Sequence, residues 1–346
     1  MKKVCFVEKP VILCAPEPRS LALIFTVENL KVLQAGYQLI EVEQDDIANL
    51  SPDILAQVSY IIGQPSLSRA TLAALVNLRC IFNVESNLLN NMPYDVLFER
   101  GIHVVTTGAV FAKPVAELGL GLALCLARNI VDADLDFRQG SEAWGGEGNQ
   151  SARLLSGASI GLVGFGDLGK ELVGVLGGFR AKIQVFDPWL PPSAITKYGA
   201  TPASLEDVFS QSDVVFVVAS VTSDNLHFID KTWFARMQKG AHFILLSRAD
   251  VVNFDDLIAA VKAGHIQAAS DVFPQEPLAL DHPVRGLKGF IRSAHRAGAL
   301  DVAFTQMGEM VLEDLALLDK NLPPMSCKRA ERETVARMRS KPVTVN

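Results

Sequence analysis

The sequence lacks the features of several protein classes. Its five cysteines are odd in number, widely spaced and without a CxxC or other metal-ligand spacing; they are Cys5, Cys14, Cys80, Cys125 and Cys327. A disulfide framework or a zinc site is therefore not expected, and a reducing cytoplasm fits this cysteine usage best. The first residues hold early prolines and no long apolar core that ends in a cleavage site, so no signal peptide is expected.

Long hydrophobic runs and a strong charge imbalance are also missing. The longest apolar stretch, Leu118 to Ala127, is flanked by Glu117 and Arg128 and is too short to span a bilayer. The net charge is only -6, which does not suit a nucleic-acid binder with a broad positive surface. We therefore expect neither membrane insertion nor a nucleic-acid partner.

What the chain does contain is enough apolar sequence for two cores. Of its 346 residues, 49% are hydrophobic and 20% are charged, and this length favours two globular domains. In the first hundred residues, a helical pattern at Thr26 to Gln34 lies among short apolar runs. The expected strands are Val4 to Val7, Gln38 to Val42, Tyr60 to Gly63, Cys80 to Asn83 and His103 to Val105. This alternation predicts an open, mainly parallel α/β sheet.

A second alternating series follows a long helical pattern at Pro114 to Phe137 and a glycine-rich loop at Gly140 to Gly148. Its expected strands are more apolar, as a sheet covered on both faces requires: Ile160 to Val163, Ile183 to Phe186, Val214 to Val218, Phe243 to Leu246, Ala268 to Ala269 and Phe290 to Ile291. A last helix, Val302 to Leu318, is predicted to return to the first domain, which makes the second domain an insertion.

A dinucleotide-binding motif opens this second series. Gly164-Phe165-Gly166-Asp167-Leu168-Gly169 joins an apolar strand to a helical pattern, so the glycines lie at a strand-to-helix turn. Gly164 allows the tight turn, Gly166 lets backbone approach a pyrophosphate, and Gly169 allows close packing of helix on strand. The helix N-terminus then offers N–H groups to phosphates. The alternative is that these glycines serve only a tight turn.

An acidic residue indicates which dinucleotide is bound. The next strand ends in Phe186-Asp187, eighteen residues after Gly169, where a carboxylate can accept hydrogen bonds from an adenosine ribose diol and would repel a 2′-phosphate. No Arg or Lys follows Asp187 before Lys197. NAD is therefore favoured over NADP as the cofactor, unless Asp187 only caps its strand.

Three later segments each follow an apolar strand, so each is expected at the carboxyl edge of the sheet. They are residues 246–253 (LSRADVVN), 271–277 (DVFPQEP) and 293–298 (SAHRAG). Together with the glycine motif and Val115-Ala116-Glu117, they resemble the D-isomer-specific 2-hydroxyacid dehydrogenase family in consistent order from about Leu78 to Leu300. The first 75 residues match that family only in pattern.

The resemblance implies a fold of two Rossmann-like α/β domains. The NAD-binding domain, residues 111–299, would be inserted into a flavodoxin-like substrate-binding domain of residues 1–110 and 300–346. The implied reaction is hydride transfer between NAD and a small 2-hydroxy or 2-oxo acid, because the cofactor supplies the hydride and the protein orients the reactants.

The resemblance also implies three catalytic residues. Arg248 would hold the substrate carboxylate with its guanidinium fork and polarise the carbonyl. His295 would donate the proton to the carbonyl oxygen and take it back in the reverse direction. Glu276 would orient the imidazole and favour its protonated form. Taken singly, each fits an ordinary surface or loop residue; their order and spacing favour catalysis. The other histidines, His103, His227, His242, His265 and His282, are expected to be structural or exposed.

The same resemblance implies further residues that contact the cofactor and the substrate. Asp271 would lie near the nicotinamide carboxamide. The expected cofactor contacts are Gly164, Phe165, Gly166, Asp167, Leu168, Gly169, Asp187, Ala219, Ser220, Thr222, Ser247, Arg248, Asp271, His295 and Ala297. The expected substrate contacts are Glu85, Ser86, Asn87, Arg248 and His295. No metal is expected.

The sequence departs from the family pattern in several places. Asn83 to Asn87 replaces a glycine-rich loop whose N–H groups hold the substrate carboxylate, and Glu85 adds an acid there. Ala249, Asn253 and Ala294 replace a usual Gly, Asp and Pro. Residues 218–222 depart from a proline-containing loop beneath the cofactor. None of these changes removes a catalytic group.

Several alternatives stay open at this stage. A catalytically weak NAD sensor of the same fold would keep the same motifs, and Arg296 or Lys113 could meet a second anionic group of a substrate. A homodimer is expected through the helix of Pro114 to Phe137 and the Trp144 loop. The basic segment after Pro323 fits a solvated helix or docking arm better than an anion site.

Overall fold

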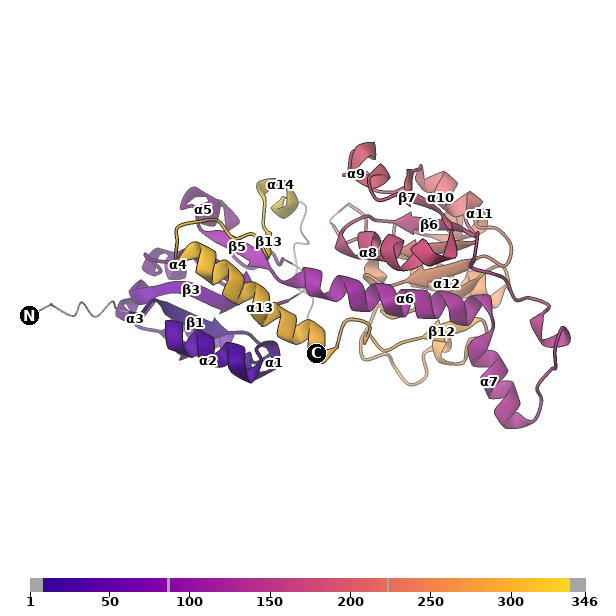
Figure 1. The fold of residues 1–346 in the computed structure, drawn as a ribbon, viewed down its shortest axis with the longest axis horizontal. Coiled ribbons are helices and arrows are strands. Elements are labelled where there is room, and N and C mark those ends of the chain that lie inside the picture. Colours follow the sequence, from indigo (N-terminus) through magenta and orange to yellow (C-terminus); the bar gives the residue numbers. More distant parts are fainter. Residues whose placement is uncertain (1–8, 86–87, 223, 337–346) are drawn as a thin grey trace, which may run out of the picture. The chain divides into compact units, whose positions relative to one another are not determined.

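The computed structural model describes residues 9–85, 88–222 and 224–336. They form two compact units (Figure 1). Among the described residues, unit 1 holds those up to 110 and those from 299 onward, and unit 2 holds those from 111 to 298. Unit 2 is therefore inserted in the chain of unit 1, and the architecture is the expected one of two α/β domains.

Unit 1 is built on a six-stranded sheet in the order β13-β5-β4-β3-β1-β2. The strands are β1 (Val11–Ala15), β2 (Gln38–Glu41), β3 (Val58–Gly63), β4 (Cys80–Asn83), β5 (His103–Thr106) and β13 (Lys328–Arg329). All pairs are parallel except the antiparallel pair of β13 with β5. The order of the first five strands is that of a flavodoxin-like sheet.

Helices pack on this sheet, and a Ser or Thr side chain caps the N-terminus of four of those that the structure describes. Ser20, Thr26, Ser51 and Ser68 each accept a hydrogen bond from a backbone N–H of the helix that follows. The helices are α1 (Leu21–Ile24), α2 (Val27–Gly36), α3 (Pro52–Gln57), α4 (Arg69–Ala74), α5 (Tyr94–Glu99), α13 (Asp301–Leu318) and α14 (Arg332–Val335), with 3-10 turns at Gln44–Asn49 and Gly108–Phe111. α13 packs against α1 and α2, as the returning helix was predicted to do.

The first strand of unit 1 was not predicted. β1 is fully buried between β2 and β3, although it is only five residues long and lies between Pro10 and Pro16. Both prolines stand outside the strand, where the missing N–H does no harm to the ladder. The apolar run predicted as the first strand, Val4 to Val7, lies outside the described residues.

Unit 2 is built on a seven-stranded, wholly parallel sheet in the order β12-β11-β10-β9-β6-β7-β8. The strands are β6 (Ser159–Val163), β7 (Lys182–Phe186), β8 (Thr201–Pro202), β9 (Val214–Val217), β10 (His242–Leu245), β11 (Gln267–Ser270) and β12 (Phe290–Arg292). This is the doubly wound order of a dinucleotide-binding domain, and its switch point lies between β6 and β9. The predicted strands are confirmed, and the short β8 was missed.

Two cores cover the faces of this sheet. Val215 and Val217 face one core, and Val214 and Phe216 of the same strand face the other. The helices are α6 (Ala112–Ala127), α7 (Ile130–Gln139), α8 (Asp167–Leu176), α9 (Pro192–Thr196), α10 (Leu205–Gln211), α11 (Lys231–Arg236) and α12 (Phe254–Lys262), with 3-10 turns at Glu147–Asn149, Gly177–Phe179, Ala249–Val251 and Pro283–Gly286. Burial on both faces explains why the strands of unit 2 are so apolar.

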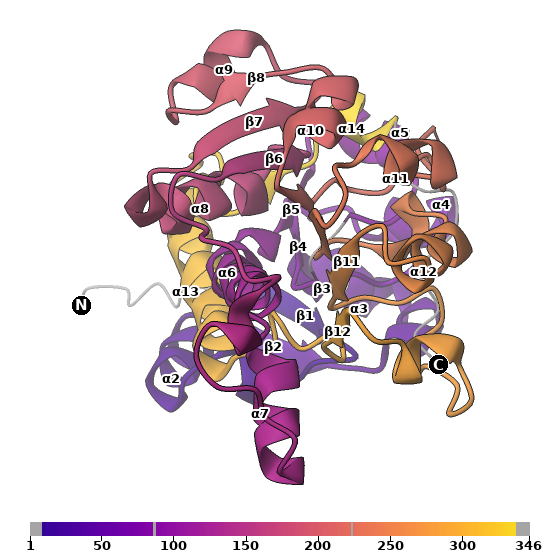
Figure 2. The same cartoon turned by 90° about the vertical axis from the view of Figure 1, so that its right-hand side faces the viewer.

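The long helix predicted at Pro114 to Phe137 is two helices. α6 ends at Ala127, and α7 begins after Asn129, whose φ of 52° lies in the left-handed region. α6 packs on α8, β10 and β11, whereas α7 has no buried residue and projects from the sheet of unit 2 (Figure 2). The break lets the chain leave the core at the point where its apolar face ends.

The apolar stretch in this region is longer than the run Leu118 to Ala127. Among the described residues, one helical stretch, Gly108–Ala127, is long and apolar enough to cross a bilayer by length and composition alone. A core helix passes the same test. The packing of α6 on the sheet identifies this part as a core helix of unit 2.

Candidate active site

The glycine motif forms the turn from β6 to α8. Gly164 has a φ of +96°, and a Cβ built there would lie 2.7 Å from Cα of Ala219. A Cβ on Gly169 would lie 2.8 Å from the carbonyl oxygen of Gly164. No other residue fits either position without moving backbone. A Cβ on Gly166 would meet nothing within 4 Å, so open space lies beside the start of α8.

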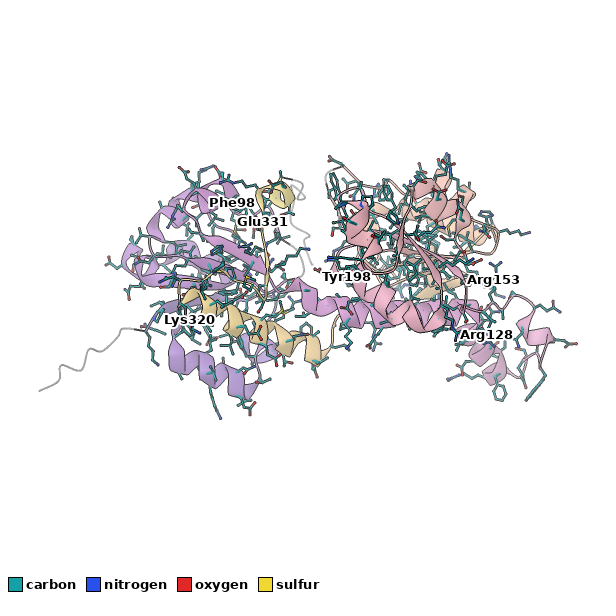
Figure 3. All side chains as sticks on the ribbon, turned by 45° about the horizontal axis from the view of Figure 1, so that its top comes forward. Phe98, Arg128, Arg153, Tyr198, Lys320 and Glu331 are labelled. Atoms are coloured by element: carbon teal, nitrogen blue, oxygen red, sulfur yellow. The ribbon has the colours of Figure 1, made fainter. Side chains whose placement is uncertain are left out.

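Asp187 organises this turn from the end of β7. Its Oδ2 accepts a hydrogen bond from the N–H of Phe165 at 2.8 Å, and its Oδ1 accepts one from the N–H of Trp189 at 2.9 Å. The carboxylate is thus held in place with acceptor capacity left for ribose hydroxyls. The side chain of Phe165 is fully buried, with its ring against that of Tyr198 at 5.6 Å (labelled in Figure 3).

The start of α8 is suited to a pyrophosphate. Gly166 is the N-cap and offers no side chain to the first N–H groups of the helix, so these donors point to the open space beside it. The carboxylate of Asp167 in this first turn suits the positive end of the helix but repels a phosphate, and Lys170 lies 3.7 Å from it. The glycines, the helix end and Asp187 together fit NAD.

The loop after β9 lies at the same edge of the sheet. Asn225 closes it, because its Nδ2 donates to the carbonyl of Ser220 at 2.8 Å and its Oδ1 accepts from the N–H of Thr222 at 2.7 Å. Ala219 stands directly against Gly164. Asn225 was missed at the sequence level because its spacing to Ser220 is that of an ordinary loop residue.

Arg248 extends from the end of β10. Its Nη1 donates to the carbonyl of Ser247 at 2.7 Å, and the next residue, Ala249, is buried. The side chain of Ser247 donates to the carbonyl of Val217 on β9 at 3.5 Å. The backbone around Arg248 is therefore anchored on both sides.

Glu276 and His295 form a close pair. Nδ1 of His295 lies 2.6 Å from Oε2 of Glu276, and the N–H of Phe273 donates to Oε1 at 2.8 Å. Burial acts to raise the pKa of Glu276, but the hydrogen bonds from His295 and Phe273 and the charge of Arg248 outweigh it and lower this pKa. Glu276 is therefore ionised, and it responds to the charges of both Arg248 and His295.

Asp271 holds the loop that carries the imidazole. It is only 1% exposed, and its two oxygens accept the N–H groups of Arg296 and Ala297, each at 3.1 Å. Its carbonyl accepts the N–H of His295 at 2.7 Å. His295 has a φ of 47°, a region that costs a non-glycine residue free energy. The three bonds to Asp271 stabilise this conformation, a role that the sequence did not reveal.

Unit 1 places one predicted substrate residue at the carboxyl edge of its own sheet. Glu85 follows β4, and its carboxylate forms an ion pair with Arg19, which follows β1. Arg19 was missed because it lies in the part of the chain where the family resemblance is weakest. Ser86 and Asn87 lie outside the described residues. Lys113 and Arg296 are both exposed residues of unit 2.

A cavity of about 690 Å³ lies away from these groups, at the amino ends of β10 and β11, opposite the glycine motif. Its polar lining includes Arg153 (Figure 3), Lys262 and Lys288. Size alone does not locate the chemistry here, because the ionisable pair and the helix N-terminus are at the carboxyl edge.

Comparison with known proteins agrees with this geometry. Residues 120–297 match the family described as "D-isomer specific 2-hydroxyacid dehydrogenase, NAD binding domain". A glyoxylate reductase of Thermofilum pendens is 34% identical over 65% of this chain and 68% of its own length. A hydroxypyruvate reductase of Thermotoga maritima is 28% identical over 68% of this chain and 74% of its own.

Solved structures agree with both fold and family. A phosphoglycerate oxidoreductase from Rhizobium etli is 65% identical and superposes with a TM-score of 0.87 over 94% of this chain and 99% of that one. The D-mandelate dehydrogenase of Rhodotorula graminis, 21% identical with a TM-score of 0.75 over 94% and 98% of the two chains, shares the fold. The chain belongs to the D-isomer specific 2-hydroxyacid dehydrogenases and is an NAD-dependent oxidoreductase of that family.

Proposed function

We propose that the protein interconverts a D-2-hydroxy acid and its 2-oxo acid with Arg248, Glu276 and His295 as the catalytic residues. The observation that carries this proposal is the 2.6 Å pair of His295 and Glu276, with Glu276 also under the influence of the Arg248 charge. A guanidinium, an imidazole and a carboxylate in one cluster supply carboxylate binding, proton transfer and charge balance.

In this mechanism each side chain acts on one part of the substrate. Arg248 binds the carboxylate through its fork of N–H donors. His295, with its Nδ1 on Glu276, has Nε2 free to donate a proton to the carbonyl oxygen during reduction and to take it from the hydroxyl during oxidation. Glu276 stays ionised and favours the protonated imidazole. Gly164, Gly166 and Asp187 would hold NAD, which would supply or accept the hydride when bound.

The binding of NAD by unit 2 is also part of the proposal. Unit 2 would bind the remaining parts of NAD through Leu168, Ala219, Ser220, Thr222 and Ser247. In this arrangement Asp271 and Ala297 act by positioning the loop of His295, as their hydrogen bonds suggest. The relatives named above are enzymes, so we do not propose the NAD-sensing alternative.

The experiment is NADH oxidation at 340 nm with glyoxylate, hydroxypyruvate, pyruvate and 3-phosphohydroxypyruvate. Arg248→Ala and His295→Ala are the comparison variants. We expect the wild-type protein to reduce at least one of these acids much faster than either variant does. Equal rates for all three proteins on every acid would refute the proposal.

We also propose a homodimer in the cytoplasm, without a membrane partner. The helix α7 and the loop after it expose large apolar side chains, including Phe137 at 61% and Trp144 at 73%, whose rings pack against each other at 6.4 Å. Exposed apolar surface of this kind is typical of an interface. Sedimentation should give the mass of two chains, and Phe137→Asp should lower it; the mass of one chain for the wild type would refute the dimer.

A further inference from the structure

The cavity at the amino ends of β10 and β11 has a positively charged lining. Arg153, Lys262 and Lys288 contribute to it, and the described residues that line it include no Asp or Glu. The three cations come from separate segments of unit 2, namely the segment before β6, the end of α12 and the turn before β12. The fold thus brings three positive charges together in a chain whose net charge is -6.

The two lysines have no anionic partner within the part of the chain that the structure describes. Lys262 and Lys288 are both exposed, and neither forms an ion pair there. Their field is therefore not cancelled locally. A hollow lined by charges of one sign focuses this field and attracts anions more strongly than single lysines on a flat surface do.

Arg153 is held at the cavity by backbone groups (the residue is labelled in Figure 3). Its N–H donates to the carbonyl of Ala127 at 2.7 Å, and its Nη2 donates to that of Lys239 at 3.2 Å. A Cβ built on Gly240, whose φ is +74°, would lie 2.8 Å from the same Nη2, so the guanidinium lies directly against a residue without a side chain. The carboxylate of Asp213 is 3.9 Å from Nη1, which is too far for a hydrogen bond. The guanidinium is therefore fixed while most of its five N–H donors stay available.

Two buried ring nitrogens near the cavity lack a partner. His242 begins β10, is 2% exposed, and lines a smaller cavity of about 90 Å³ that Arg153 also lines. His265 lies between two residues that line the larger cavity, Gly264 and Ile266. Among the described residues, neither Nδ1 of His242 nor Nε2 of His265 has a hydrogen-bond partner. Buried polar atoms nearly always have one, so these nitrogens indicate a polar occupant of this region.

The size and chemistry of the cavity define its occupant. Its volume of about 690 Å³ is in the range of small-molecule sites. A guanidinium and two ammonium groups without a carboxylate match a ligand that carries several negative charges, as phosphate and carboxylate groups do. His242 adds no charge, because burial and the charge of Arg153 lower its pKa to about 4.

We propose that this cavity is a binding site for a small multivalent anion, an organic polyphosphate or polycarboxylate. The cavity and the glycine motif lie at opposite edges of one sheet, so the anion does not compete with NAD. The turns into β10, β11 and β12 line the cavity, and the same strands end at Arg248, Asp271 and the loop of His295. An anion that bridges these turns stabilises unit 2 by its binding free energy.

The test is isothermal titration calorimetry with tripolyphosphate and with citrate. It uses the full chain with NADH at saturation, so that the cofactor site is filled, and at constant ionic strength. The variants are Arg153→Met and the double variant Lys262→Met/Lys288→Met. The control is Lys231→Met, which removes an exposed cation of α11 that does not line the cavity. Acetate is the monovalent control anion.

We expect a Kd below about 1 mM for at least one of the two multivalent anions and much weaker binding of acetate. The double lysine variant and Arg153→Met should each raise this Kd at least about tenfold, because charge-assisted partners are lost, and Lys231→Met should leave it unchanged. Tighter binding of tripolyphosphate assigns phosphate to the site, and tighter binding of citrate assigns carboxylate. Because both lysines are exposed, the double variant should unfold at the wild-type temperature when no anion is present.

Several results would overturn the proposal. They are no binding of either multivalent anion up to about 10 mM, the same Kd in the wild type and the double lysine variant, or binding that disappears when NADH is added. If the double variant has a lower sedimentation mass than the wild type without any anion, a second copy of the chain occupies the cavity, and the anion site is wrong.

Discussion

Each unit contains a buried carboxylate that accepts hydrogen bonds from backbone N–H groups of a loop. The two loops differ in what they contribute to the protein. Asp271 in unit 2 accepts the N–H groups of Arg296 and Ala297. Asp314 on α13 in unit 1 is fully buried and accepts those of Met325 at 2.7 Å, Ser326 at 2.8 Å and Cys327 at 2.8 Å. In both cases backbone N–H donors satisfy the oxygens of a buried side chain.

What differs is the segment that each carboxylate holds. The loop at Asp271 carries His295, a residue with a costly φ and the proposed proton donor. The segment at Asp314 leads into β13, which covers the edge of β5, and then into α14, where Arg332 lies 5.1 Å from the ring of Phe98 (Phe98 and Glu331 are labelled in Figure 3). A buried carboxylate that accepts backbone N–H groups therefore holds the loop of the proposed proton donor in unit 2, whereas in unit 1 it holds the segment that completes the sheet.

The comparison requires that the loop held by Asp271 carries a catalytic group. His295→Ala should lower kcat by about 10²- to 10⁴-fold, the usual loss on removing a general acid. The free energy of unfolding should change little, because the side chain is 46% exposed. The measurement is steady-state kinetics beside urea unfolding. His103→Ala in unit 1 is the control, and a comparable loss there would contradict the assignment.

Asp314 should matter to stability and not to rate. In Asp314→Asn, an amide –NH₂ would face at least one of the three N–H donors, so we expect the free energy of unfolding to fall by about 2–4 kcal/mol. Urea unfolding followed by circular dichroism measures it, with Glu309→Gln, an exposed change on the same helix, as the control. If kcat of Asp314→Asn fell as much as that of His295→Ala, the proposed difference between Asp314 and Asp271 would be wrong.

Asp271 should affect the rate through geometry. Asp271→Asn removes one of the two acceptors that hold the loop, so we expect kcat/KM to fall by about ten- to a hundredfold from misplacement of His295. Binding of NADH, measured by fluorescence titration, should change much less than the rate. Asp281→Asn, an exposed neighbour in sequence, is the control. A variant that loses stability but keeps full activity would show that the two carboxylates do the same work.

Glu276 should change the pH dependence more than the maximal rate. Its pKa is lowered, so its carboxylate contributes to stability above its ordinary pKa and loses this contribution as the pH falls through the lowered one. In Glu276→Gln the protonated imidazole loses its anionic neighbour. As the pH is raised, the rate of reduction, which needs the protonated imidazole, should therefore decline at a lower pH than in the wild type. The rate of oxidation, which needs the neutral imidazole, should show no such decline. Coincident profiles for reduction would argue against the pair.

The sequence predicted the structure of unit 2 better than that of unit 1, and the reason is physical. Glycines at a tight turn and apolar strands buried on both faces leave local patterns, so Gly164, Asp187 and nearly all strands of unit 2 were predictable. Asp271 was placed at the site, but its hydrogen bonds depend on a turn 25 residues later. Arg19 meets Glu85 across 66 residues, and no local pattern records such a pair.

The insertion of unit 2 between β5 and α13 sets an order of events during synthesis. The ribosome releases β1 to β5 first, but α13 and β13, which complete the sheet and cover its edge, emerge only after all of unit 2 has been made. Since domains generally fold as units, the nucleotide-binding unit can finish while unit 1 is still open. A nascent chain stopped near Gly298 should therefore bind NADH while unit 1 is still incomplete.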